Sequence, residues 1–158
     1  KKILPDVVDA LKKINDSKFL AVIISNQPAI AKGIITKKEL DKDLTSLSTM
    51  LGNKGVYLDR IYYCPHHPEK GFKSEITSLK VKCNCRKPNN GLFLKAIRDM
   101  NIDIKNSFMI GDQFSDYLAA KKTKLKFVGI NLDFKSKEKI ISKNNLLSAV
   151  NFIINSSN

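Results

Sequence analysis

Apolar residues recur along the chain with two spacings that alternate from one end to the other. Helix-like spacing predicts helices over residues 7–14, 36–51, 91–100, 114–122 and 146–154. Short apolar runs lie between them and predict strands at residues 19–24, 56–63, 107–110 and 126–130. The run at 19–24 is unbroken and rich in β-branched residues, so we expect a strand buried on both faces. Residues 25–33, which follow this run, are predicted to form a loop.

Strands that alternate with helices are typical of a parallel sheet with right-handed crossovers. The fold class predicted is α/β, a Rossmann-like parallel sheet flanked by helices, in one domain over residues 1–158. Thr36 and Glu39 have the spacing of a capping box at a helix start. Only residues 64–90 lack periodicity, and a segment of that length inside a compact domain should carry its own organisation.

The composition excludes some classes of protein. No apolar run approaches the ~20 residues needed to cross a bilayer, and no leader peptide opens the sequence, so we expect a cytoplasmic protein and no membrane partner. The formal net charge is +13, but among the 28 basic residues only Arg60, Arg86 and Arg98 are arginine. Scattered lysines indicate solvated faces, and an anionic small substrate would explain part of the charge equally well. A nucleic-acid-binding domain is a distant alternative.

The three cysteines and a histidine frame the aperiodic segment. Cys64 and His66 lie at its start, and Cys83 and Cys85 lie near its end. Four such ligands match a closed structural zinc site, and metal binding would supply the folding energy that this segment lacks. His67 is an alternative ligand of low weight, and the plainer interpretation is a set of buried free thiols.

Polar residues follow two of the predicted strands. Ser25 and Asn26 follow the first strand, and Gly111 and Asp112 follow the third, so both pairs should lie at the same edge of a parallel sheet. A carboxylate there can bind Mg²⁺, and a hydroxyl with backbone N–H groups can hold phosphoryl oxygens. Taken singly, these motifs are equally compatible with a helix cap and a polar turn.

Two further groups could act in the same chemistry. Arg86 and Lys87 precede a helix and could neutralise and orient an anionic substrate, although two surface cations are the plainer interpretation. Asp116 is expected to hydrogen-bond nearby loop groups.

Taken together and in order, the motifs resemble one family. They are Ser25-Asn-Gln, Ala31-Lys-Gly33, the run from Ile61 to Pro68 with Cys-Pro-His-His-Pro, Cys83-Asn-Cys-Arg-Lys-Pro88 and Met109-Ile-Gly-Asp112. The set is similar to the D-glycero-D-manno-heptose 1,7-bisphosphate 7-phosphatases of the haloacid-dehalogenase (HAD) superfamily, relatives of the histidinol-phosphate phosphatases. The resemblance covers nearly the whole chain.

The resemblance implies a Mg²⁺-dependent phosphatase that hydrolyses a sugar phosphate through an aspartyl-phosphate. It implies catalytic roles for Ser25, Lys87 and Asp112, the last as the Mg²⁺ ligand. It implies Zn²⁺ on Cys64, His66, Cys83 and Cys85, and substrate-binding roles for Ser25, Asn26, Gln27, Pro28, Arg86, Lys87 and Gln113. A monomer with no nucleic-acid partner is expected.

The sequence departs from the family's pattern in three places. Ser25 stands where Thr is common, Pro28 begins a loop that usually reads Ser-Gly-Ile-Ala-Arg-Gly, and Gln113 replaces a Lys that often follows the Mg²⁺ ligand. The family's Asp-x-Asp nucleophile segment is also absent from the sequence, and the resemblance places it before Lys1. We therefore expect the 158 residues to be inactive alone, and histidinol-phosphate hydrolysis or a non-catalytic binding module are the alternatives.

Overall fold

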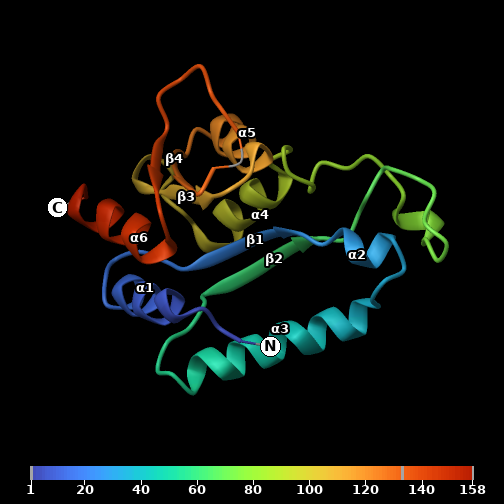
Figure 1. The fold of residues 1–158 in the computed structure, drawn as a ribbon, viewed down its shortest axis with the longest axis horizontal. Helices are drawn as coiled ribbons and strands as arrows, with labels where there is room; N and C mark the ends of the chain where they lie inside the picture. The colour runs from blue at the N-terminus through green and yellow to red at the C-terminus, as the bar shows by residue number, and fades with distance from the viewer. Residues whose placement is uncertain (1, 133, 158) are drawn as a thin grey trace.

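The computed structural model describes residues 2–132 and 134–157, so both termini of the predicted domain and Asp133 lie outside the described residues. The predicted helices and strands occur in the predicted order, and α2 and β5 are present in addition (Figure 1). The elements are α1 (Pro5–Asn15), β1 (Val22–Asn26), α2 (Pro28–Ala31), α3 (Lys37–Gly52), β2 (Arg60–Cys64), α4 (Gly91–Met100), β3 (Phe108–Gly111), α5 (Phe114–Thr123), β4 (Lys126–Ile130), β5 (Ile141–Lys143) and α6 (Leu146–Asn155). Single 3₁₀ turns occur at Thr77–Leu79 and Ile104–Asn106.

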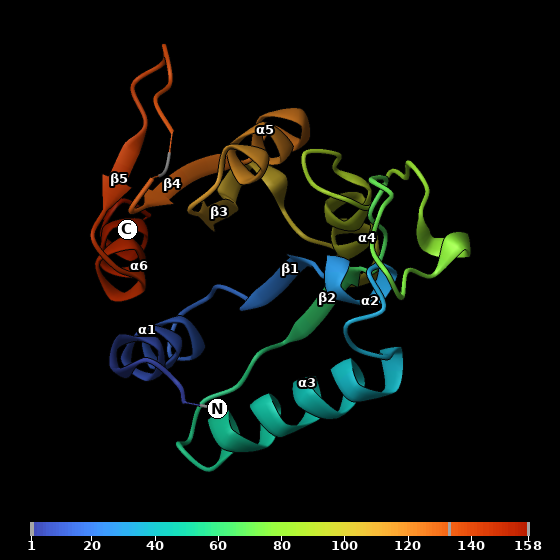
Figure 2. The ribbon, with the colours of Figure 1, turned by 45° about the vertical axis from the view of Figure 1, so that its right-hand side comes forward.

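All strand pairs among these residues are parallel, which confirms the predicted fold class. β1 pairs with β2, and β3, β4 and β5 pair in that order. The strands therefore form two small sheets and not the one sheet expected. Figure 2 shows α3 running alongside β1 and β2, with α5 and α6 beside the other sheet. No helix in the described ranges is long and apolar enough to span a bilayer.

Three apolar clusters hold these layers together. Leu11 of α1 packs with Leu51 of α3, Leu92 of α4 packs beneath β2, and Ile153 of α6 packs with Val128 of β4. The predicted capping box is present at the start of α3, where the side chain of Thr36 accepts a hydrogen bond from the backbone N–H of Glu39. The start of α3 is thus fixed by local polar contacts, and the inward faces of the helices are fixed by apolar burial.

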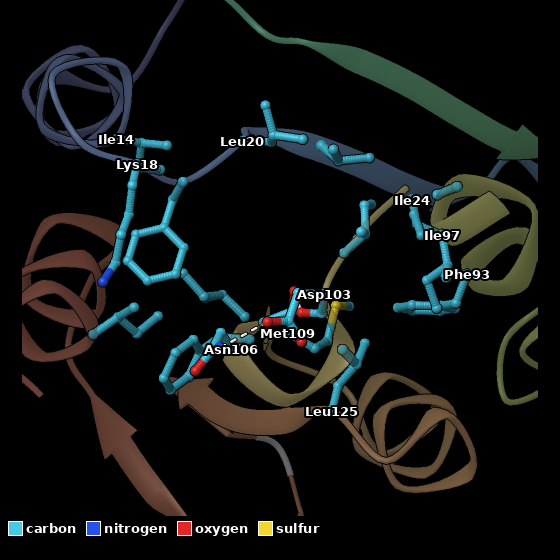
Figure 3. Close-up of a pocket in the computed structure, with 18 of the residues that line it drawn as sticks. Ile14, Lys18, Leu20, Ile24, Phe93, Ile97, Asp103, Asn106, Met109 and Leu125 are labelled. Atoms are coloured by element: carbon cyan, nitrogen blue, oxygen red, sulfur yellow. Dashed lines mark hydrogen bonds between the residues drawn. The ribbon is translucent and has the colours of Figure 1, made fainter. Parts of the chain in front are cut away.

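The prediction of a first strand buried on both faces is wrong. β1 begins three residues later than the apolar run, and each of its five residues keeps partial exposure. Among the described residues β1 pairs with β2 along one edge, and beside its other edge lies a cavity that residues of β3 and α4 also line (Figure 3).

Other elements also differ from the prediction, among them β2, which begins at Arg60 and not at residue 56. The loop expected at 25–33 begins inside β1 and contains the one-turn helix α2, which Pro28 starts at the position where a missing N–H costs least. β5 is a strand that the apolar pattern does not predict, because two of its three residues are exposed.

Candidate active site and metal centre

The cysteine-containing segment brings four possible metal ligands to one point. The ligand atoms of Cys64, His66, Cys83 and Cys85 all lie within 4.8 Å of one another. Cys64 ends β2 and is fully buried, and the others reach it from the long segment that follows. The Sγ atoms of Cys64 and Cys85 are 2.8 Å apart, and His66 Nδ1 lies 3.2 Å from Cys85 Sγ.

The donor set fits zinc in number and in type. A tetrahedral zinc with bonds of about 2.0–2.3 Å holds its ligand atoms about 3.3–3.8 Å apart, and the contacts recorded here run from 2.8 to 3.6 Å. A small outward movement of the thiols therefore makes room for the ion. No fifth ligand joins the set among the described residues, which is typical of a structural site.

The thiols also affect one another's ionisation. Burial, and then hydrogen bonds from the neighbouring thiols, raise the pKa of Cys85. Burial likewise raises the pKa of Cys64. Burial opposes ionisation of Cys83 too, yet hydrogen bonds led by the one from Cys85 outweigh it and lower the Cys83 pKa. Several thiolates this close together require a cation between them.

His67 lies outside the cluster, in agreement with the prediction that His66 and not His67 is the ligand. Its buried ring packs edge-on against Phe72, with the ring centroids 5.7 Å apart, and its Nε2 faces Glu69. Next to it, the buried ammonium of Lys80 lies over the same Phe72 ring and 3.6 Å from Glu75. These packing contacts give the long segment its shape, and no sequence motif predicts them.

Lys87 occupies the carboxyl edge of both sheets. Its Nζ donates to the carbonyl oxygen of Ile24 on β1 at 2.8 Å and to Asp116 Oδ1 on α5 at 2.7 Å. The side chain is only 11% exposed. An ammonium has three donors, so one N–H remains for a further acceptor at this edge. The predicted meeting of the ends of β1 and β3 is therefore present, with Lys87 as the bridge.

Asp116 is held on both of its carboxylate oxygens. Oδ1 faces Lys87, and Oδ2 accepts the backbone N–H groups of Asp112 and Gln113 at 3.3 and 3.2 Å. A Cβ on Gly111 would come within 2.5 Å of the Asp116 side chain, so only glycine permits this approach. The hydrogen bonds from the backbone of Asp112 and Gln113 confirm the role expected for Asp116. The ion pair between Asp116 and Lys87 was not predicted from the sequence. The carboxylate of Asp112 is left exposed at the end of β3.

The residues that follow β1 are arranged by hydrogen bonds. Gln27 Nε2 donates to Ser25 Oγ at 3.0 Å, so the hydroxyl proton of Ser25 can be donated elsewhere. Asn26 Nδ2 donates to the carbonyl of Lys87 at 3.1 Å, and Asn26 Oδ1 accepts the N–H of Lys87 at 3.0 Å. The side chain of Asn26 therefore holds the backbone that carries Lys87. Pro28 starts α2 beside this loop.

Arg86 connects the two sites. Its NH1 donates to the carbonyl of His66 at 3.3 Å, and it stands between the ligand Cys85 and Lys87 in the sequence. Gln113, by contrast, is exposed and forms the N-cap of α5 in a capping box with Asp116.

The fold and this edge together define a class. A parallel α/β sheet with a lysine, a hydroxyl and a carboxylate at its carboxyl edge is the arrangement of the HAD-like hydrolases, and a family model described as HAD-hydrolase-like matches residues 84–150. A crystal structure of the D,D-heptose 1,7-bisphosphate phosphatase of B. bronchiseptica, complexed with magnesium and phosphate, has the same fold. Its TM-score is 0.81 at 20% identity, over 97% of this chain and 84% of that chain.

Curated relatives identify the family. The chain is 35% identical over 126 residues to a Thermoplasma volcanium protein named "probable D-glycero-D-manno-heptose-1,7-bisphosphate 7-phosphatase", covering 79% of each chain. It is 40% identical over 118 residues to the D-glycero-beta-D-manno-heptose-1,7-bisphosphate 7-phosphatase of Haemophilus ducreyi, covering 74% of this chain. This chain belongs to the D-glycero-D-manno-heptose-1,7-bisphosphate 7-phosphatase family. It spans 62% of the length of the Haemophilus ducreyi relative.

Proposed function

We propose that the chain is the main part of a Mg²⁺-dependent phosphatase that removes the 7-phosphate of D-glycero-D-manno-heptose 1,7-bisphosphate. The observation that carries the proposal is the placement of Lys87. Its ammonium is held between Ile24 and Asp116 at the carboxyl edge and keeps one donor free. The names of the relatives support the choice of substrate.

Three side chains act on the phosphoryl group in this proposal. The ammonium of Lys87 neutralises charge on the transferring oxygens, and the hydroxyl of Ser25 donates its proton to one of them. The exposed carboxylate of Asp112 binds Mg²⁺ through oxygen, as this hard cation prefers. Bound Mg²⁺ supplies further positive charge beside the phosphate.

Other side chains bind or position the substrate. Arg86 offers a guanidinium fork for an anionic or hydroxyl group near Lys87. Gln27 fixes the hydroxyl of Ser25, and Asn26 fixes the backbone of Lys87. Pro28 and Gln113 border the same edge, and Gln113 offers a neutral amide to the sugar.

The proposed nucleophile is an aspartate on a strand that is not among the 158 residues. Asp6 and Asp9 lie on α1 and Asp16 caps its end, so none of the three stands at the end of a strand. The carboxylate attacks phosphorus, and the phosphate–sugar oxygen bond breaks while the leaving alcohol takes a proton from the second aspartate of the Asp-x-Asp segment. Water then cleaves the acyl phosphate and releases inorganic phosphate.

The remaining parts of the proposal concern the state of the protein. Zinc on the four-ligand cluster is structural, because all four positions are filled by protein groups. The protein is one domain, acts as a monomer in the cytoplasm and has no nucleic-acid partner.

Phosphate release measures the proposal directly. The 158-residue chain should show no turnover, and the same chain joined to an Asp-x-Asp strand should release phosphate from the heptose bisphosphate when Mg²⁺ is present. Turnover by the chain alone, purified free of host phosphatases, would contradict the assignment of the nucleophile. Faster hydrolysis of histidinol phosphate than of the heptose bisphosphate would replace the proposed substrate.

A further inference from the structure

The loop that follows β1 is attached to the long segment that follows β2. The loop covers residues 27–33 and includes α2, and Figure 2 shows α2 beside the green part of the chain. The backbone N–H of Gln27 donates to the carbonyl of Cys64 at 2.8 Å, and the N–H of Ile76 donates to the carbonyl of Ala31 at 2.9 Å. The loop is thus held at its start and near its end by the same segment.

The two segments also touch through their backbones. Gly33 has a φ of +68°, and a Cβ on it would lie 1.7 Å from the carbonyl oxygen of Ser74. Only glycine permits both this left-handed conformation and this approach. Ile30 and Ala31, just before it, are buried. The loop therefore packs against the long segment as closely as an element of the core.

A phenylalanine ring lies between cations from both segments. The ammonium of Lys32 lies 4.4 Å from the centroid of the Phe72 ring, and that of Lys80 lies 4.7 Å from it. The face of an aromatic ring attracts a cation through its quadrupole. Glu75 shapes the turn that presents the ring, because its Oε2 accepts the backbone N–H groups of Gly71 and Phe72 at 3.0 and 3.2 Å.

Lys80 fixes the ring from the side of the long segment. Its side chain is only 1% exposed, and its Nζ makes no hydrogen bond with the described residues. The carboxylate of Glu75, 3.6 Å away, and the face of Phe72 offset its charge. A buried ammonium needs such partners, so the ring is held in place whether or not Lys32 contacts it. Phe72 can therefore act as a fixed support for Lys32.

We propose that Phe72 and Lys32 are positioning residues for the phosphatase reaction. Their contact fixes the carboxyl end of α2, where the N–H of Lys32 donates to the carbonyl of Pro28 at 3.0 Å. Gln27 directly precedes α2, and its Nε2 donates to Ser25 Oγ at 3.0 Å. The contact thus acts on the hydroxyl of Ser25 through α2. This step rests on the proposed function, in which that hydroxyl donates to a transferring oxygen.

Hydrogen exchange measures the contact without any catalysis. In the 158-residue chain, Lys32→Met keeps an unbranched stem and removes the charge. The amides of residues 28–33 should then exchange about three- to tenfold faster, which is the size of effect expected for a partly buried cation–π contact. Lys32→Arg retains a cation for the ring and should restore the parental exchange. Lys73→Ala, at an exposed lysine beside Phe72, is the matched control and should change nothing.

Turnover by the chain joined to an Asp-x-Asp strand separates positioning from substrate binding. A loosened loop misplaces the hydroxyl of Ser25 in the transition state, so kcat for Lys32→Met should fall by about three- to tenfold. Zinc content should stay at the parental value, because no ligand of the cysteine cluster is changed. A lysine that only bound substrate would instead raise KM with kcat unchanged, and that result would overturn the proposal.

A second variant tests whether Lys32 acts through the ring. Phe72→Leu keeps an apolar side chain and removes the aromatic face. Two changes that break one contact are not additive, so Lys32→Met combined with Phe72→Leu should have the kcat of the slower single variant. Effects that multiply would show that Lys32 acts independently of Phe72 and would contradict the proposal. Parental exchange of residues 28–33 in both single variants would contradict it as well.

The outcomes distinguish this proposal from the proposed function. If Lys32→Met loosens residues 28–33 and Lys32→Arg restores them, but the parent chain with its added strand releases no phosphate from the heptose bisphosphate, the contact stands and the phosphatase proposal fails. If the parent turns over and Lys32→Met loosens the loop yet keeps the parental kcat, the positioning role alone is overturned.

Discussion

The cysteine cluster and the carboxyl edge are both built from polar side chains, but they differ in completeness. The cluster has all four ligand atoms within 4.8 Å of one another. At the edge, Lys87 and Asp116 form a pair at 2.7 Å, while Asp112 remains exposed and an open cavity lies beneath. A closed site can form within one segment of chain, whereas an active site must keep donors and space for groups that arrive later.

The two regions are also connected through the backbone. Cys85, Arg86 and Lys87 are consecutive, so the cluster fixes one end of the segment that carries the lysine. Asn26 fixes the other side of it through two hydrogen bonds to the backbone of Lys87. The cysteine cluster is thus placed to position Lys87 through the backbone.

Loss of the cluster should have the largest effect. Cys83→Ser removes one of four ligands, and structural zinc sites in small peptides contribute about 10–16 kcal/mol of apparent binding free energy. We expect about one equivalent of zinc in the parent protein and much less in the variant. Hydrogen exchange should accelerate over residues 64–90 more than in the strands, because the metal is the main anchor of that segment.

Ser78→Ala is the matched control for this change, since Ser78 is exposed in the same segment. It should leave metal content and exchange unchanged. A parent protein that holds less than about a tenth of an equivalent of zinc after dialysis would contradict a four-ligand site.

Loss of the Lys87 side chain should have the second-largest effect. In the 158-residue chain joined to an Asp-x-Asp strand, Lys87→Ala removes a preorganised donor, so turnover should fall by about 100–1,000-fold and added Mg²⁺ should not restore it. The control is Lys82→Ala, at an exposed lysine of the same segment. Rates are compared per folded molecule, because Lys87→Ala also leaves Asp116 buried without its cation. A rate within twofold of the parent would make Lys87 a purely structural cation.

The contrast between the two regions also explains what the sequence could predict. The ligands of the cluster are Cys and His residues at recognisable spacing, so Cys64, His66, Cys83 and Cys85 were found together. The longer helices and most strands followed from apolar periodicity, whereas the one-turn helix α2 did not. The pairing of Lys87 with Asp116 joins residues that no motif connects, because folding alone brings α5 against the end of β1.

The burial of β1 failed as a prediction for a related reason. An unbroken apolar run predicts a strand in the interior of a sheet. It does not show which adjacent strands are present. β1 has one neighbour among the described residues, and its side chains stay partly exposed. β5 was missed because its exposed residues leave only backbone pairing to define it, and pairing depends on β4.

Loss of the metal-binding carboxylate should have the smallest of the three effects. Asp112→Asn keeps the shape of the side chain and the backbone bond from Asp112 to Asp116, but it removes a charge that Mg²⁺ requires. Turnover at limiting Mg²⁺ should fall at least about tenfold, the lower end of what disturbing a metal site costs. Because Asp112→Asn weakens metal binding, a high Mg²⁺ concentration should recover part of the rate, whereas it should not do so for Lys87→Ala. Asp9→Asn, at an exposed residue of α1, should leave the Mg²⁺ titration unchanged. If Asp112→Asn keeps the parent's Mg²⁺ dependence, Asp112 only supports the start of α5, and the edge then binds its cation through other oxygens.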